Sequence, residues 1–406
     1  MIRSYTFALG LLWLSASHAQ QPWCTNQDLV AADRGYIYNA PQVHLLANGE
    51  LVGIFPMDRY VSDAVHHGVK YNWYASKNGG LAWEALAAPP SEFVPLGLYD
   101  TPVRALRLHD GSLLATGEHG WENFPETERA RLSAEGYYLF DASAGNAPGV
   151  VSIIRRVIMS RSRDGGKSWH TGDVPLPFMP HLAIYGNAIL LRDGTYVQPA
   201  WGRFDLKKEP KWVSSLALRT EDGGRHWDIA TVARATDFDF NETSIAEAPN
   251  GDLVAVIRTT AQKELWTTFS TDRGKTWSAP RDSGMRGSTP WVVTTKQGLV
   301  VAVYIRREKS LFPSTGVFAC LSRDNGRTWD VEHEALLRDT ATTRVDGYPQ
   351  AAALPDGSVY AVYVLELFLP RRSGSEITSA PRRTAVGGTH FSPLYQGPLI
   401  LPYDRK

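Results

Sequence analysis

Residues 240–258 read FNETSIAEAPNGDLVAVIR. Two apolar runs flank Asn250-Gly251, and this order predicts two antiparallel strands around a tight turn, because Asn-Gly supplies the positive φ values that a two-residue hairpin requires. Glu242 lies eight residues before Asn250, and Arg258 lies eight residues after it. The hairpin therefore returns a carboxylate and a guanidinium to the same end, which we interpret as a candidate site.

The same hairpin pattern recurs along the chain, as expected of a repeat architecture. The six members are Leu45–Phe55, Leu106–Thr116, Ile189–Ala200, Ile245–Ile257, Val292–Tyr304 and Ala351–Tyr363. Their turn glycines are Gly49, Gly111, Gly194, Gly251, Gly298 and Gly357. Six similar hairpins predict six similar units.

A second motif, Ser/Thr-x-Asp-x-Gly-x-x-Trp, alternates with these hairpins. Its copies are Ser162–Trp169, Thr220–Trp227, Ser270–Trp277 and Ser322–Trp329, with a degenerate copy at Ser76–Trp83. The pattern is typical of a turn in which Asp caps backbone amides, Gly takes a positive φ and Trp packs on a sheet. We expect these boxes to be structural and to lie away from any site.

One bare hairpin and one box-bearing hairpin make a four-stranded unit. The sequence thus predicts an all-β fold, a six-bladed β-propeller of four-stranded antiparallel blades, over residues 20–406 as one domain. The sixth unit, from Arg344 onward, has no box. Its outer strands must come from the C-terminal segment, with a contribution from residues that follow the N-terminal leader.

Residues 1–19 have the features of a secretory signal peptide, with Arg3 ahead of an apolar run and a small-residue ending at Ala19. We therefore expect a secreted or periplasmic protein. Only two cysteines are present, which cannot make a disulfide framework, although a Cys24–Cys320 bridge stays open for an exported chain. No later stretch predicts a membrane span.

Charge also limits the partners. Lysine plus arginine and aspartate plus glutamate both number 42, so the formal net charge is zero and no nucleic-acid partner is indicated. We expect a monomer without a cofactor or metal ion. Adjacent His66 and His67 would point in different directions on a strand, which argues against a shared metal.

One unit is longer than the others. The surplus, about Gly120 to Val150, follows the second strand of its blade and therefore emerges at the same end as Arg258. It is interpreted as a rim or lid over the site, or as an elaborated loop.

In a propeller, residues about nine before and seven to ten after each turn glycine collect at one mouth. The rule selects Asn39, Asp58, Arg59, Tyr99, Asp100, Glu118, His119, Tyr185, Trp201, Arg203, Glu242, Arg258, Trp291, Arg306, Arg307, Asp346, Tyr348 and Glu366. So many charges at a concavity are costly unless they are paired or used, which favours a site that binds an anion.

At this point the chain resembles the sialidase (neuraminidase) superfamily of Asp-box, or BNR repeat, proteins. The boxes carry the resemblance to the fold. More specific are Asn241-Glu242 through Arg258, similar to a family segment in which a glutamate precedes a substrate-binding arginine, and Tyr348 nine residues before Gly357, similar to the segment of the nucleophilic tyrosine.

The resemblance implies roles for these residues. Tyr348 would be the nucleophile, Glu242 its base and Asp63 the general acid, with His66 and His67 as competitors for the acid. Substrate-binding residues are expected at Arg258, Arg59, Arg306, Arg307, Asn39 and His119. The implied substrate is a glycan with a terminal acidic sugar.

One departure from the family pattern concerns the substrate. Asn39 stands where the family carries an arginine ahead of the first turn, so one positive charge of a three-arginine clamp is missing. Two alternatives therefore stay open. One is a hydrolase or lyase for another uronic-acid-like sugar, with His66, His67 or His119 as acid or base. The other is a non-catalytic carbohydrate-binding propeller.

Overall fold

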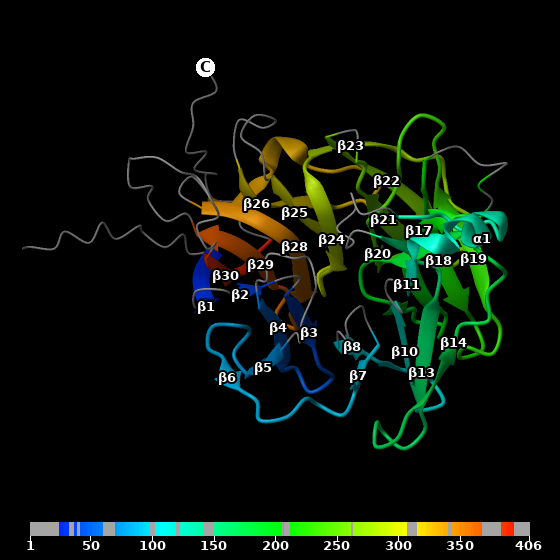
Figure 1. Ribbon diagram of the computed structural model, residues 1–406. Coiled ribbons are helices and arrows are strands. Elements are labelled where there is room, and N and C mark those ends of the chain that lie inside the picture. The colour runs from blue at the N-terminus through cyan, green and yellow to red at the C-terminus, as the bar shows by residue number, and fades with distance from the viewer. Residues whose placement is uncertain are drawn as a thin grey trace, which may run out of the picture.

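Each of the six predicted hairpins forms and belongs to an antiparallel sheet of its own. The structure is a computed structural model and describes residues 24–31, 36–38, 41–59, 70–96, 102–118, 122–140, 149–204, 206, 212–260, 263–306, 315–339, 343–367 and 383–393. The sheets are arranged radially (Figure 1), so the fold is the predicted six-bladed β-propeller.

The first three blades have short breaks in their inner strands. Blade 1 contains β2 (Tyr36–Tyr38), β3 (Gln42–Leu45), β4 (Leu51–Arg59), β5 (Lys70–Ser76) and β6 (Glu84–Ala85). Blade 2 contains β9 (Leu106–Arg107), β10 (Leu113–Glu118), β13 (Val157–Ser162) and β14 (His170–Asp173), preceded by the pair β7 (Phe93–Pro95) and β8 (Pro102–Arg104). Blade 3 contains β15 (His181–Ile184), β16 (Ile189–Leu190), β17 (Tyr196–Arg203), β18 (Ser214–Thr220) and β19 (Asp228–Ala233).

The last three blades are regular four-stranded sheets. Blade 4 contains β20 (Thr243–Glu247), β21 (Leu253–Ile257), β22 (Glu264–Ser270) and β23 (Arg281–Arg286). Blade 5 contains β24 (Ser288–Thr294), β25 (Val300–Arg306), β26 (Gly316–Ser322) and β27 (Ala335–Asp339), with the 3-10 turn η4 (Val331–His333) before β27. Blade 6 contains β28 (Thr343–Ala353), β29 (Val359–Leu367), β30 (Arg383–Phe391) and β1 (Cys24–Ala31).

Blade 6 closes the ring by combining both ends of the chain. Its strand order is β28-β29-β30-β1, and Cys24 of β1 lies opposite Phe391 of β30. The prediction that the sixth blade takes outer strands from the C-terminal segment and from residues after the leader is confirmed. The signal peptide itself, residues 1–19, lies outside the described residues.

The turn of the opening hairpin differs from the prediction. Gly251 has a φ of 89°, but Asn250 is not among the residues with positive φ. The Gly251 N–H donates to the Ala248 carbonyl at 2.9 Å. The connection is therefore a four-residue turn closed by one left-handed glycine, not a two-residue turn with two positive φ values. The turns at the other five glycines close in the same way.

The boxes form the predicted turns. In the first box the Ser168 N–H donates to Asp164 Oδ1 at 2.9 Å, and the Gly166 N–H donates to Ser162 Oγ at 2.8 Å. The degenerate box uses its amide in the same way, with the Ala82 N–H donating to Asn78 Oδ1 at 2.8 Å. These turns lie at the end of the blades that carries the hairpin glycines.

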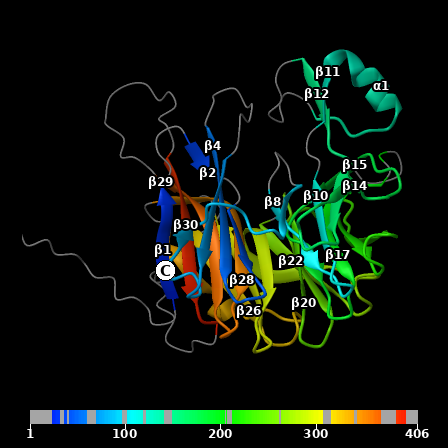
Figure 2. The same cartoon turned by 90° about the horizontal axis from the view of Figure 1, so that it is seen from below.

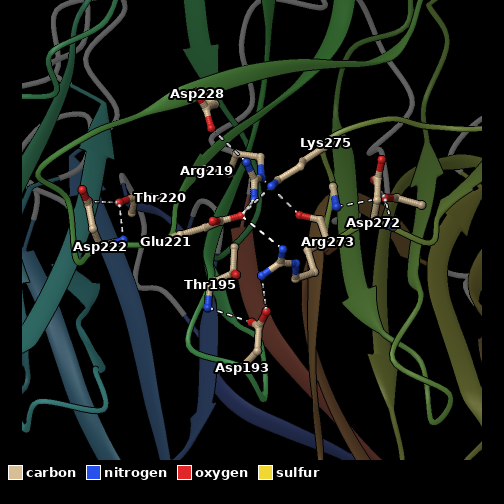
Figure 3. A network of polar contacts seen from close by, with 12 residues as sticks. Asp193, Thr195, Arg219, Thr220, Glu221, Asp222, Asp228, Asp272, Arg273 and Lys275 are labelled. Atoms are coloured by element: carbon tan, nitrogen blue, oxygen red, sulfur yellow. Dashed lines mark hydrogen bonds and ion pairs between the residues drawn. The ribbon is translucent and has the colours of Figure 1, made fainter.

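A polar network joins blades 3 and 4 at that turn end (Figure 3). Arg219 is 1% exposed and pairs with Asp228 at 2.9 Å and with Glu221. Glu221 also accepts from Lys275 at 3.1 Å, while Arg273 of the next box reaches Asp193 at 3.0 Å. At the turn end of the propeller, buried Arg219 is thus ion-paired within blade 3, and ion pairs between exposed side chains join this blade to blade 4.

The core lies between neighbouring blades. In β25 the side chains alternate: Val301 and Val303 pack against blade 6, whereas Ala302 and Tyr304 pack against blade 4. This alternation is the period-2 pattern of a strand with both faces buried.

The long unit forms a small subdomain of its own. It contains β11 (Glu122–Pro125), the 3-10 turn η2 (Glu126–Glu128), α1 (Arg129–Ala134) and β12 (Val150–Ile153). Leu132, Val151 and Ile153 form its core. In Figure 2 it projects from one end of the propeller, beyond the ends of β10 and β15. We refer to these elements and the segment to Phe140 as the insertion.

The cysteines are free. Cys24 and Cys320 are both buried and do not form a bridge with each other. In the described part of the chain, no helix has the length and hydropathy needed to cross a bilayer.

Candidate active site

The opening hairpin brings Glu242 and Arg258 together, as predicted. Thr243 lies opposite Ile257, so the residues just outside the strands also face each other. The Arg258 N–H donates to the Glu242 carbonyl at 2.9 Å, and Arg258 Nη1 lies 2.7 Å from Glu242 Oε1. The ion pair therefore follows directly from the hairpin register.

Hydrogen bonds of Asn241 fix the backbone at Glu242. Its side-chain oxygen accepts the Glu242 N–H at 2.7 Å, and its amide nitrogen donates to Thr260 Oγ1 at 2.7 Å. The Glu242 side chain is only partly accessible, with 11% exposure. Its position is thus held by main-chain and side-chain contacts.

Among the described residues, only Oε1 of Glu242 has a partner. Oε2 is buried and has no hydrogen-bond partner among the described residues. A buried acceptor without a donor costs roughly 1–3 kcal/mol or more for a charged group. The free oxygen is therefore available to a proton or to a group on a bound molecule.

Two tyrosines from other blades lie beside this pair. The rings of Tyr185 and Tyr348 are 6.0 Å apart between centroids. Burial acts to lower the pKa of Arg258, but Glu242 raises it, with further contributions from Tyr348 and Tyr185, and the pKa ends above its ordinary value. Arg258 therefore stays charged beside one carboxylate and two phenols.

The residues that meet here share one sequence position. Tyr185, Glu242 and Tyr348 each lie nine residues before the turn glycine of their hairpin, in blades 3, 4 and 6. Arg258 lies seven residues after its glycine. The propeller superimposes these positions at the mouth, the end opposite the boxes.

A second carboxyl group stands near this cluster. Glu118 ends β10, seven residues after Gly111, and its Oε2 accepts the Ile184 N–H at 3.2 Å. Burial raises the pKa of Glu118 from 4.5 to about 7, and the Ile184 hydrogen bond lowers it by less. Raised carboxyl pKa values of this kind are frequent at functional sites.

The insertion rests on blade 3 through Tyr138 and Phe140. Tyr138 stacks on His181 with centroids 5.1 Å apart, and Phe140 and Trp201 contact the same ring edge-on. The Tyr138 N–H also donates to the Pro180 carbonyl at 3.0 Å. The insertion thus emerges at the mouth, as predicted, and is docked on the rim through an aromatic cluster.

The structure unites three predicted site residues, Tyr348, Glu242 and Arg258. It places Arg306 in other contacts, since its guanidinium pairs with Glu334 at 2.5 Å and lies 4.0 Å above the Phe318 ring. Arg306 therefore balances a carboxylate of its own blade.

The remaining predicted residues lie beyond what the structure describes. Arg59 is described only as the end of β4, opposite Tyr36, without its side chain. The predicted site residues outside the described residues are Asn39, Asp63, His66, His67, His119 and Arg307.

Two residues gain significance from the structure. Tyr185 and Glu118 were expected at the mouth without a chemical role. Their position nine before or seven after a turn glycine, shared with Tyr348 and Arg258, is the signal that identifies them. Among the described residues, no group of three or more His, Cys, Asp or Glu side chains is gathered as for a metal ion.

Comparison with known proteins gives consistent results. The family of BNR repeat-like domains matches residues 138–361. A sialidase from Bacteroides fragilis is 24% identical over 330 residues, which cover 75% of this chain and 56% of that protein, so the chain spans little more than half the length of this relative.

Solved structures show the same fold. A protein of unknown function from Dyadobacter fermentans has a TM-score of 0.62 at 22% identity, with 91% of this chain and all of that chain covered. A sialidase from Streptococcus pneumoniae has a TM-score of 0.54 at 11% identity, with 92% of this chain and 71% of that chain covered.

Proposed function

Since the chain belongs to the family of BNR repeat-like domains within the sialidase superfamily, we propose that it is a secreted retaining exo-glycosidase of sialidase type. Its substrate is a glycan from which it hydrolyses a terminal acidic sugar, either sialic acid or a related one. The observation that carries the proposal is the cluster of Glu242, Arg258 and Tyr348, in which Glu242 Oε2 is buried without a partner among the described residues.

The nucleophile is Tyr348 in this proposal. A substrate whose anomeric carbon bears a carboxylate repels an Asp or Glu nucleophile, whereas a phenol brings no charge until it is deprotonated. Glu242 Oε2 takes the phenol proton as the Tyr348 oxygen bonds to the anomeric carbon. The bond to the leaving oxygen breaks, and water later releases the sugar from Tyr348 with retention.

Arg258 binds the substrate carboxylate in this proposal. Its guanidinium is charged and fixed by Glu242 at 2.7 Å, which leaves further N–H groups for a bidentate contact. Asp63 is proposed as the acid that protonates the leaving oxygen, on the strength of the family resemblance. Arg59, Arg307, Asn39 and His119 are proposed to complete the substrate pocket.

A turnover assay tests the proposal. Residues 20–406 are incubated with a fluorogenic α-sialoside and a panel of acidic glycans, beside Tyr348→Phe. We expect the substitution to abolish release. Tyr74→Phe is the matched control, since Tyr74 stacks on Phe55 at 5.2 Å within blade 1 and should retain activity. Turnover that persists in Tyr348→Phe would contradict a tyrosine nucleophile.

Asn39 supports a second candidate function. Because an amide replaces an expected arginine, the pocket suits a uronic-acid-like sugar, cleaved by a hydrolase or lyase that uses a histidine. Turnover of a uronate glycan that is insensitive to Tyr348→Phe, with no release from the sialoside, would favour this second function. Binding without turnover would instead indicate a carbohydrate-binding propeller.

Export is proposed from the N-terminal sequence. Removal of residues 1–19 during secretion predicts a mature N-terminus at Gln20. Mass spectrometry of the protein recovered from the periplasm or medium would measure this terminus, and an intact Met1 there would contradict cleavage.

A further inference from the structure

Glu118 occupies the position in blade 2 that Arg258 occupies in blade 4. Each is the seventh residue after its turn glycine, so both side chains begin at the mouth. Glu118 Oε2 accepts the N–H of Ile184, the residue before Tyr185. Tyr185 in turn lies beside Tyr348 and acts on the pKa of Arg258. Glu118 is thus linked to the candidate active site by one hydrogen bond and one peptide unit.

Glu118 has no cationic partner in the part of the chain described. Val157 lies opposite it in β13, and the two arginines that precede Val157 pair elsewhere, Arg155 with Glu122 and Arg156 with Asp173. On blade 3, His181 is enclosed by aromatic rings, and Arg203, which lies opposite His181, is 5.9 Å from the centre of the Tyr138 ring. Among the described residues, the carboxyl group therefore has only the Ile184 amide to stabilise a charge.

The proton of Glu118 has a defined place. With burial raising its pKa to about 7, the carboxyl is mostly neutral at mildly acidic pH. In the neutral acid, Oε2 accepts from the Ile184 N–H, which leaves Oε1 as the oxygen that carries the proton. Oε1 has no hydrogen-bond partner among the described residues, and the neutral acid offers one unused donor.

We propose that protonated Glu118 donates a hydrogen bond from Oε1 to an oxygen of the acidic sugar bound at Arg258, and so determines specificity for an anionic substrate. The inference rests on the proposed function for the class of substrate. A neutral carboxyl can donate to an anionic sugar through a charge-assisted hydrogen bond. An ionised Glu118 would lose this donor and repel the sugar carboxylate.

The proposal predicts that binding depends on pH. If only the neutral form binds, the apparent Kd rises as the neutral fraction falls, by roughly tenfold between pH 6 and pH 8 for a pKa near 7. The sugar carboxylate is ionised at both pH values, so it contributes no change. A neutral methyl ester meets no repulsion and should show a smaller dependence.

Calorimetry with free sugars tests the proposal without requiring turnover. N-acetylneuraminic acid, glucuronic acid and their methyl esters are titrated at pH 6 and pH 8 into residues 20–406 and into Glu118→Gln. We expect the wild type to bind an acid about tenfold more weakly at pH 8. Gln keeps a donor but cannot titrate, so its Kd should change less than about twofold. Glu84→Gln, on the exposed strand β6, is the matched control and should behave like the wild type.

Other results of the titrations would contradict either the role of Glu118 or the proposed substrate class. The role of Glu118 is refuted if the pH dependence of Kd persists unchanged in a folded Glu118→Gln variant, or if the wild type shows no pH dependence. Neither result contradicts the proposed function. If the wild type binds neither acid at pH 6 or pH 8 but does bind uncharged sugars, the result refutes the proposed substrate class. The Glu118 inference is then refuted with it.

Discussion

Replacing Glu118 by Gln should stabilise the protein at alkaline pH. In the unfolded chain a glutamate releases its proton near pH 4.5, whereas in the folded protein Glu118 keeps it until about pH 7. Between these values the unfolded state binds fewer protons, so the free energy of unfolding falls as the pH rises. The stabilisation is therefore fully present below pH 4.5 and is lost as the pH rises through about 7.

The magnitude follows from the size of the pKa shift. A change from 4.5 to about 7 corresponds to a loss of about 3 kcal/mol by pH 8, at 1.36 kcal/mol for each pH unit. Gln has the same shape and can still accept the Ile184 N–H, but it carries no titrating proton. The difference in unfolding free energy between variant and wild type should therefore shift in favour of the variant by about 3 kcal/mol from pH 4 to pH 8.

Urea unfolding at pH 4 and pH 8 measures this difference. All other titrating groups are common to both proteins and cancel in the comparison. Glu84→Gln on exposed β6 should change stability by less than about 0.5 kcal/mol at either pH. A stability difference between Glu118→Gln and wild type that is the same at both pH values would refute the raised pKa and the burial that causes it.

Two further predictions concern the turn glycines and Arg306, which pairs with Glu334. Gly251→Ala should lower the free energy of unfolding by about 1–2 kcal/mol, because Gly251 has a φ of 89° and no atom lies near the added Cβ. Gly80→Ala should lower it more, because the added Cβ would lie 2.1 Å from the fully buried Tyr360 ring. Equal losses of stability in urea unfolding would contradict the clash. Arg306→Met should lower stability by about 3–5 kcal/mol without changing KM, because it removes the cation that pairs with the 13% exposed Glu334. A raised KM at full stability would instead place Arg306 in the substrate pocket.

The blades could be predicted from the sequence because each hairpin carries its register in its own residues. The turn glycine and the alternating apolar positions fix which residues are opposite, so the sequence pairs Glu242 with Arg258 without reference to any tertiary contact. The turn type was predicted wrongly because Asn250-Gly251 is compatible with two geometries. Pro249 precedes Asn250, and the structure has the longer turn, in which only Gly251 has a positive φ.

Side-chain direction explains which candidate residues meet at the mouth. A range of seven to ten residues after the turn glycine ignores the period of two in a strand. Glu118 and Arg258 lie seven residues after their glycines, whereas Arg306 lies eight residues after Gly298. The extra residue turns Arg306 to the opposite face of its strand, toward Glu334 and Phe318. The sequence therefore contains the information on side-chain direction. A range of seven to ten residues after the glycine includes both faces of the strand and does not use it.

The acid of the site could not be predicted in the same way. In the sequence, Asp63 follows the second strand of the first hairpin, and neither register nor parity selects a residue beyond a strand end, so the resemblance alone identifies it. Glu118 was found at the mouth by counting, but its raised pKa depends on burial between blades 2 and 3 and on the Ile184 amide. Such an environment arises only from tertiary packing.

The two ends of the propeller treat buried charge differently. At the turn end, Arg219 is 1% exposed and is paired with Asp228 and Glu221, in a network that ties blade 3 to blade 4 (Figure 3). Among the described residues at the mouth, Glu242 Oε2 has no hydrogen-bond partner and Glu118 has no cationic partner. Unpaired buried groups lower the stability of a fold, so they persist where a ligand supplies the missing contact. This contrast indicates that the boxes hold the blades together, while the mouth keeps a buried acceptor available for a ligand.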